Sequence, residues 1–213
     1  MQLHSFFNSS TSYRVRIALA LKGLEYDTLP VNIRTGEHRA PDYVADINPS
    51  ASVPTLTDRE FRLGQSLAII DYLDQAHPEP RLIPLEPKQR ARVLELAALI
   101  SCDIHPVNNL RVLRYLETEL KVDAQQKSAW YRHWIAEGMA GVERLLDRAL
   151  AGPWCFGAHP TIADVCLVPQ IANALRMNCD LHAYRRSLAV YEYALKHPAF
   201  DVAQPKHQPD YIA

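Results

Sequence analysis

The N-terminal eighty residues alternate between short apolar runs and helical periodicity. Residues 2–7 are a brief apolar and aromatic run, which is typical of a buried strand. Val15, Ala18 and Leu19 then recur at helical spacing, and Gly23 ends this pattern, so a helix is predicted between the hydroxyl cluster at residues 9–12 and this glycine. The remaining elements predicted here are strands over residues 25–32, 53–57 and 59–63, and a helix over residues 67–75 with Ser66 as its N-cap.

Strand–helix–strand followed by two strands and a helix describes a thioredoxin-like α/β layer. Residues 34–47 are polar and irregular, with one helical turn expected near residues 41–46. Residues 77–87 hold four prolines in eleven positions, a composition typical of a semi-rigid extended connector. We therefore predict a first domain over residues 1–80. The alternative, a long surface loop within one domain, leaves the change in composition beyond it unexplained.

Residues 88–213 have helical periodicity throughout, so an all-α second domain is predicted. Pro87 suits the first turn of its first helix, and Pro106 should kink or break that helix. The third helix should be buried at the domain centre because it is apolar nearly all round. The predicted helices cover residues 88–120, residues 123–150 with Asp123 as cap, a stretch that begins at the Thr161–Asp164 capping box, and residues 185–196, with loop after Pro198.

Composition excludes several classes of function. The chain has 213 residues and a formal net charge of −1, so it lacks the basic field that non-specific nucleic-acid binding requires. Neither a membrane-spanning apolar stretch nor a signal peptide is recognised, and no membrane association is expected. The four cysteines form no CxxC pair and no metal-binding spacing with the histidines, which favours reduced thiols, a cytoplasmic location and no metal.

The candidate chemistry begins with the hydroxyl cluster Ser9-Ser10-Thr11-Ser12, which precedes the first predicted helix. A helix N-terminus presents unpaired backbone N–H groups and the positive end of the helix dipole, and both favour an anion. Hydroxyl groups at this position can add hydrogen bonds to the same charge. The competing interpretation is a well-capped helix with no ligand.

Residues 9–19, Ser-Ser-Thr-Ser-Tyr-Arg-Val-Arg-Ile-Ala-Leu, resemble the signature of zeta-class glutathione transferases, a class that includes the maleylacetoacetate and maleylpyruvate isomerases. The usual form is Ser-Ser-Cys-Ser-x-Arg-Val-Arg-Ile-Ala-Leu, so Thr11 stands where a cysteine is common. The resemblance covers essentially the whole chain. It implies glutathione as cofactor, a small-molecule substrate, and a homodimer whose interface involves the long helix from Lys88.

The resemblance also implies roles for individual residues. The catalytic candidates lie in the hydroxyl cluster, with Ser9 as the preferred hydrogen-bond donor to the glutathione thiol, which must ionise before it can act as a nucleophile. Catalytic roles are assigned to Ser9, Ser10 and Thr11; glutathione binding to these three and to His38, Val53, Gln65, Ser66, Asp103, His105, Asn108 and Asn109; and substrate binding to Asn8, Arg111 and Arg176, with Arg114 as a further candidate.

Two of these assignments have structural alternatives. The proline of Val53-Pro54 opens a strand, which is compatible with an edge strand or with a cis peptide. The resemblance implies a cis peptide whose preceding residue pairs with the glutathione backbone. Ser66 could cap a helix, bind the γ-glutamyl carboxylate, or do both.

A second polar group, residues 102–111, surrounds Pro106 in an otherwise apolar helix. Several local rules broken together often mark a functional site, although a solvated kink would give the same pattern. The resemblance implies that this segment lines a cleft between domains. A metal-binding role for His105 is not supported, because no partner ligand stands at helical spacing.

An isomerase of this class uses the thiolate to add to a cis double bond, after which the adduct rotates and expels glutathione as the trans isomer forms. Substrates with two carboxylates would require arginines. Two departures affect this prediction: Asn8 stands where several zeta-class isomerases carry an arginine, and Thr11 lacks the thiol that reductive dehalogenation would use. A general glutathione transferase and a non-catalytic glutathione-binding module are the alternatives.

Overall fold

The computed structural model describes residues 1–149 and 152–212, which divide into two compact units. Unit 1 comprises Met1–Ile83 and the segment from Leu195 onward, and unit 2 comprises Pro84–Ala194. The predicted second domain, residues 88–213, therefore includes a terminal segment that the structure assigns to unit 1. This segment joins unit 1 because its backbone carbonyls accept hydrogen bonds from the first helix.

Unit 1 contains a four-stranded mixed sheet with the order β2-β1-β3-β4. Strand β1 pairs parallel with β2 and antiparallel with β3, and β3 pairs antiparallel with β4. The sheet confirms the predicted thioredoxin-like α/β layer, for which the sequence did not specify a strand order. The strands are β1 (Gln2–Ser5), β2 (Asp27–Pro30), β3 (Thr55–Asp58) and β4 (Phe61–Gly64), and the helices are α1 (Ser10–Leu21), α2 (Ser66–Ala76) and α8 (Pro198–Val202), with short turns η1 (Glu37–Arg39), η2 (Tyr43–Ile47) and η5 (Pro205–His207).

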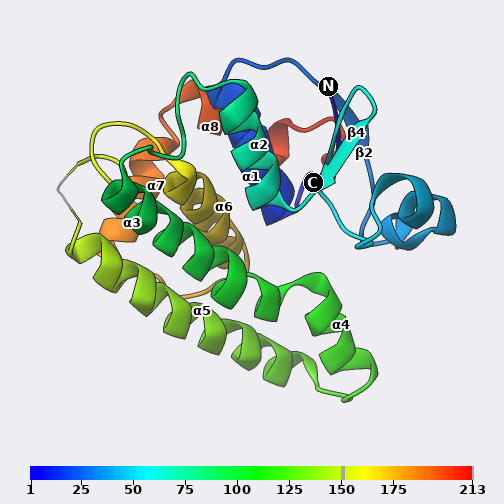
Figure 1. The fold of residues 1–213 in the computed structure, drawn as a ribbon. Helices are drawn as coiled ribbons and strands as arrows, with labels where there is room; N and C mark the ends of the chain where they lie inside the picture. The colour runs from blue at the N-terminus through cyan, green and yellow to red at the C-terminus, as the bar shows by residue number, and fades with distance from the viewer. Residues whose placement is uncertain (150–151, 213) are drawn as a thin grey trace. The chain divides into compact units, whose positions relative to one another are not determined.

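The core of unit 1 joins the sheet to its first two helices. Leu3 of β1 and Leu56 of β3 cluster with buried side chains of α1 and α2, among them Val15 and Ile69. Both α2 and α8 pack against α1 (Figure 1). Helix α1 is consequently buried on nearly all sides, so any polar side chain that it carries must find partners inside the protein.

Arg16 of α1 is such a residue, and it attaches the end of the chain to the beginning. Its fully buried guanidinium donates hydrogen bonds to the carbonyl oxygens of Phe7 at 3.0 Å and Ala203 at 3.0 Å and to Ser5 Oγ at 3.2 Å. Burial lowers the Arg16 pKa to about 10. Tyr13 adds a second connection, because its hydroxyl donates to the carbonyl of Phe200 at 3.2 Å.

The prediction of loop after Pro198 is wrong, since α8 begins at this residue and η5 follows it. Proline is compatible with a first helical position because the N–H that it lacks would have no partner there. His197 precedes it as the N-cap, and its Nδ1 accepts from the backbone N–H of Ala199 at 3.2 Å.

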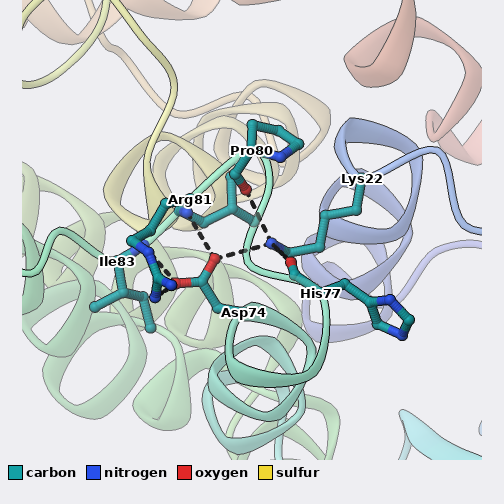
Figure 2. Close-up of polar contacts among 7 residues, drawn as sticks. Lys22, Asp74, His77, Pro80, Arg81 and Ile83 are labelled. Carbon is teal, nitrogen blue, oxygen red and sulfur yellow. Dashed lines mark hydrogen bonds and ion pairs between the residues drawn. The ribbon is translucent and has the colours of Figure 1, made fainter.

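A buried ion pair joins the ends of α1 and α2 to the connector (Figure 2). Lys22 Nζ donates to Asp74 Oδ1 at 2.9 Å and to the carbonyl oxygens of His77 and Pro80 at 2.7 and 2.9 Å. The Asp74 carboxylate also accepts backbone N–H groups from the connector, at 2.7 Å from Leu82 and 3.1 Å from Ile83. All three ammonium protons are therefore used within the protein.

Unit 2 is helical, as predicted. Helix α5 runs alongside the α3–η3 segment, and α6 packs against α3 and α7 (Figure 1). Helix α6 is almost entirely buried, which confirms its predicted central place. The elements are α3 (Pro87–Ala98), the π-helical turn η3 (Leu99–Ile104), the 3-10 turn η4 (Pro106–Asn108), α4 (Leu110–Thr118), α5 (Ala124–Asp147), α6 (Ile162–Arg176) and α7 (Arg185–Ala194).

Several predicted helix boundaries in unit 2 are confirmed. Pro87 is the first residue of α3, and Pro106 lies where the helix is interrupted between η3 and η4. Asp123 caps α5 through a capping box, and Thr161 and Asp164 form the expected box at α6. Helix α5 ends at Asp147 rather than at residue 150, which lies outside the described residues. No helix in the described ranges could span a membrane.

Replacing Lys22 by Met should lower the free energy of unfolding by about 3–5 kcal/mol. The substitution leaves the Asp74 carboxylate buried without its ammonium partner and removes the donor from two carbonyl groups. Urea unfolding followed by circular dichroism measures the change. The matched control is Arg92→Met, which breaks the exposed Arg92–Glu95 pair and should cost less than about 1 kcal/mol. A Lys22→Met variant as stable as this control would contradict the structural role of the buried pair.

Candidate functional site

Ser9 is the N-cap of α1, so its hydroxyl lies at the positive end of that helix. Its backbone is extended, with φ −84° and ψ 119°, and its Oγ accepts a hydrogen bond from the backbone N–H of Ser12 at 3.2 Å. Ser10 follows as the first helical residue and is buried. The capping interpretation of the hydroxyl cluster is therefore correct for Ser9, and it leaves the anion-binding interpretation open.

Thr11 connects Ser9 to the loop before β3. Its hydroxyl donates to the carbonyl oxygen of Val53 at 3.0 Å and lies 2.9 Å from Ser9 Oγ. A hydroxyl carries one proton, and that of Thr11 is used on Val53, so Ser9 is the donor in the Ser9–Thr11 pair. Rotation about its Cβ–Oγ bond would turn the Ser9 proton toward a ligand. The Val53–Pro54 peptide is cis, as the resemblance implied.

The N-terminus of α2 is organised by a buried arginine. Arg14 Nη1 donates to Ser66 Oγ at 3.3 Å, and both residues are buried. Because Ser66 accepts this bond, its own hydroxyl proton is directed to another acceptor. Ser66 is the first helical residue and not the N-cap, which corrects the prediction; the N-cap is Gln65, which is exposed and has φ +65°.

Sequence reasoning missed Arg14 as a contributor to this site. A signal was present, since arginines at positions 14 and 16 are flanked by apolar residues on a helix with no polar face. Of the other unit 1 candidates, His38 is buried in η1 and Asn8 is half-buried. The structure joins Ser9, Thr11 and Val53 by hydrogen bonds, and no hydrogen bond in the described ranges connects this trio to Asn8 or Gln65.

The polar segment around Pro106 belongs to unit 2, and parts of it have structural roles. Asp103 is exposed on η3, and His105 is half-buried where η3 ends. Asn109 caps α4, with its Oδ1 accepting the backbone N–H of Val112 at 3.2 Å. Asn108 is buried, and its Nδ2 donates to the carbonyl of Tyr131 at 3.1 Å. Asn108 and Asn109 therefore already use their side chains within the fold.

Arg176 lies at the C-terminal end of α6, where its side chain is exposed. Its Nη2 donates to Asn173 Oδ1, and Asn173 Nδ2 donates to the hydroxyl of Tyr131 at 2.8 Å. Burial raises the pKa of Tyr131, against an opposing effect of the nearby Arg176 charge. Arg111 is exposed on α4. Neither Tyr131 nor Asn173 stands out in the sequence, since both fit an ordinary helix pattern.

The placement of the histidines, cysteines and carboxylates among the described residues bears on metal and thiol chemistry. In the residues that it describes, no group of three His, Cys, Asp or Glu side chains could hold a metal ion. The four cysteines are free thiols. Burial is the main cause that raises the pKa of Cys155, and the adjacent Asp164 carboxylate adds to it, so this thiol is kept protonated.

Comparison with known proteins identifies both halves of the chain. The glutathione S-transferase N-terminal domain matches residues 1–75, and the glutathione S-transferase C-terminal domain matches residues 128–197. Maleylacetoacetate isomerase of Pseudomonas aeruginosa is 47% identical over 99% of this chain and 98% of its own length. A solved maleylpyruvate isomerase, described as a bacterial zeta-class glutathione S-transferase, superposes with a TM-score of 0.97 at 41% identity and full coverage of both chains.

The chain belongs to the zeta class of the glutathione transferase family. This membership confirms the resemblance carried by residues 9–19 and the two-part fold that it implied. A further relative is a maleylacetoacetate isomerase of Methylobacterium extorquens AM1, solved with bound malonate and glutathione. The match covers 100% of both chains, with a TM-score of 0.93 at 32% identity.

Proposed function

We propose that this zeta-class chain is a glutathione-dependent cis-trans isomerase of a maleyl keto acid, such as maleylacetoacetate or maleylpyruvate. The observation that supports this most directly is the Ser9–Thr11–Val53 hydrogen-bonded trio at the N-terminus of α1. Relatives with full coverage of the chain carry the names of these two isomerases. Reduced cysteines support a reducing, cytoplasmic location.

The donor set in unit 1 fits glutathione. The ligand has a thiolate and a γ-glutamyl carboxylate, and unit 1 offers two helix N-termini, those of α1 and α2, each with a serine hydroxyl. The buried guanidinium of Arg14 donates a hydrogen bond to Ser66 Oγ, so the hydroxyl proton of Ser66 can be donated to the carboxylate. Val53 supplies backbone groups to the peptide. We assign further contacts to Ser10, Thr11, His38 and Gln65, and in unit 2 to Asp103, His105, Asn108 and Asn109.

Bound glutathione supplies a thiolate that adds reversibly to the cis double bond, permits rotation about the resulting single bond and leaves as the trans isomer forms. Ser9 stabilises the thiolate by turning its hydroxyl proton from Thr11 to sulfur, with the α1 dipole acting in the same direction. Thr11 attaches the loop at Val53 to the N-terminal end of α1 through its hydrogen bond to the Val53 carbonyl. Arg176, with Arg111 and Asn8 as further contacts, binds the substrate carboxylates.

A general glutathione transferase that conjugates small electrophiles is the second candidate. Asn8 favours it, because this half-buried amide cannot supply the second fixed cation that a dicarboxylate would use. The absence of a thiol at Thr11 argues against reductive dehalogenation within this alternative.

Purified protein should convert maleylpyruvate to its trans isomer in the presence of glutathione, without consuming glutathione. Ultraviolet absorbance follows the double bond, and a thiol assay before and after the reaction tests regeneration. S-methylglutathione is the control: it retains the peptide and the carboxylates but has no thiol to ionise, so it should support no turnover. Rapid conjugation of 1-chloro-2,4-dinitrobenzene with no isomerisation of maleylpyruvate would favour the general transferase.

Replacing Ser9 by Ala should raise the pKa of the bound glutathione thiol by about 1–2 units, because a hydrogen bond to a charged acceptor contributes roughly 1.5–3 kcal/mol. Thiolate absorbance against pH measures this change. The variant also loses the α1 cap, at about 1 kcal/mol of stability. Asp123→Ala removes the cap of α5 at a similar cost and should leave the thiol pKa unchanged. An unchanged titration in Ser9→Ala would transfer the activating role to Ser10, Thr11 or the helix dipole.

We further propose a homodimer, with the α3 helix that follows the connector contributing to its interface. Class membership supports this, as do large exposed apolar side chains, including Leu85 beside the start of α3 and Phe61 on β4. Sedimentation velocity at micromolar concentration should show a species of twice the 24.1 kDa chain mass. A single monomeric species over this concentration range would exclude the dimer.

A further inference from the structure

The side chain of Arg176 is exposed, but a hydrogen bond to a neighbouring side chain restrains its guanidinium. Asn173 stands three residues earlier on α6, so the two side chains share one face of the helix. Arg176 Nη2 donates to Asn173 Oδ1. A long arginine side chain normally samples many rotamers, and this bond restricts them before any ligand arrives.

The Asn173 amide has only one orientation that suits both neighbours. Its oxygen must face Arg176, because a guanidinium can only donate hydrogen bonds. Its nitrogen therefore faces Tyr131, where it donates to the phenolic oxygen at 2.8 Å. Tyr131 thus anchors the amide nitrogen of Asn173, so the amide oxygen stays directed at one N–H of Arg176.

Tyr131 is itself fixed on α5. Its side chain is buried, and its carbonyl oxygen accepts a hydrogen bond from Asn108 Nδ2 of η4 at 3.1 Å. The adjacent Trp130 donates its indole N–H to the carbonyl of Val107 at 3.0 Å, so η4 is attached to α5 at two neighbouring points. A series of hydrogen bonds therefore connects η4 to Tyr131 on α5, Tyr131 to Asn173 on α6, and Asn173 to Arg176.

We infer that Tyr131 and Asn173 are positioning residues for Arg176 and thereby set the affinity for a carboxylate of the substrate. This inference rests on the proposed function, which gives Arg176 its ligand. A guanidinium that is already oriented loses less freedom on binding a carboxylate, so the two residues act on substrate affinity and leave the thiol chemistry unchanged.

The test compares Tyr131→Phe, Asn173→Ala and Arg176→Ala in steady-state kinetics with maleylpyruvate. The first two should raise KM by about fivefold and leave kcat nearly unchanged, and Arg176→Ala should raise KM by about tenfold or more. Conjugation of 1-chloro-2,4-dinitrobenzene, which has no carboxylate, should be unchanged in Tyr131→Phe and Asn173→Ala. Calorimetric titration with malonate at saturating glutathione gives a second readout that does not require turnover.

Tyr184→Phe is the matched control. Tyr184 lies in the same unit, and its hydroxyl donates to the carbonyl of Ala136 on α5 at 2.9 Å. Like Tyr131→Phe, the control variant therefore loses the hydrogen bond of one tyrosine hydroxyl. It should leave KM and malonate affinity unchanged. In an Arg176→Ala background, Tyr131→Phe and Asn173→Ala should have no further effect on malonate affinity, since they act only through the arginine.

The outcomes separate the inference from the function on which it rests. If Arg176→Ala weakens malonate binding and the other two variants do not, the positioning role is wrong and the carboxylate role of Arg176 stands. Equal losses with and without Arg176 would also overturn the positioning role. If Arg176→Ala leaves malonate binding unchanged, both roles fail. A wild-type protein that binds malonate through Arg176 without isomerising maleylpyruvate would overturn the proposed reaction alone.

Discussion

The buried pair of Lys22 and Asp74 is the constraint on which the arrangement of unit 1 depends. A buried ammonium is tolerated only when each of its protons has an acceptor, and Lys22 finds one on Asp74 and two on the connector backbone. The ends of α1 and α2 and the connector must therefore meet at one point. Because the two helices are joined at their C-terminal ends and also pack against each other, the positions of their N-terminal ends, where Ser9 and Ser66 lie, are restricted as well.

The hydroxyl groups at the two helix ends are oriented by the same physical principle. Each set has a neighbour that can only donate, or can only accept, a hydrogen bond, and this neighbour decides whether the hydroxyl accepts or donates. The guanidinium of Arg14 can only donate, so Ser66 accepts from it. The carbonyl of Val53 can only accept, so Thr11 donates to it and Ser9 donates to Thr11. In unit 2 the amide of Asn173 is oriented by Arg176 in the same manner.

Local sequence chemistry was enough to predict most of the elements, but not α8 and not the long-range partners. The Ser9 cap, the interruption at Pro106 and the Thr161–Asp164 box were predictable because each depends on residues only a few positions apart. Contacts such as that of Arg16 with Ala203 join residues 187 positions apart and leave no periodicity in the sequence. For the candidate site, the family signature pointed to the hydroxyls of residues 9–12, and only the three-dimensional contact of Thr11 with the Val53 carbonyl indicates that Ser9 donates to Thr11.

The return of the chain to unit 1 after Ala194 has a consequence for biosynthesis. The N-terminal part of a protein emerges from the ribosome first, and in most multidomain proteins this part folds first. Here the buried guanidinium of Arg16 has no carbonyl of Ala203 to bind until the chain has been translated past residue 203. Unit 2 is continuous in sequence and emerges complete before that moment. The unit whose synthesis begins first is therefore the last one that the cell can finish.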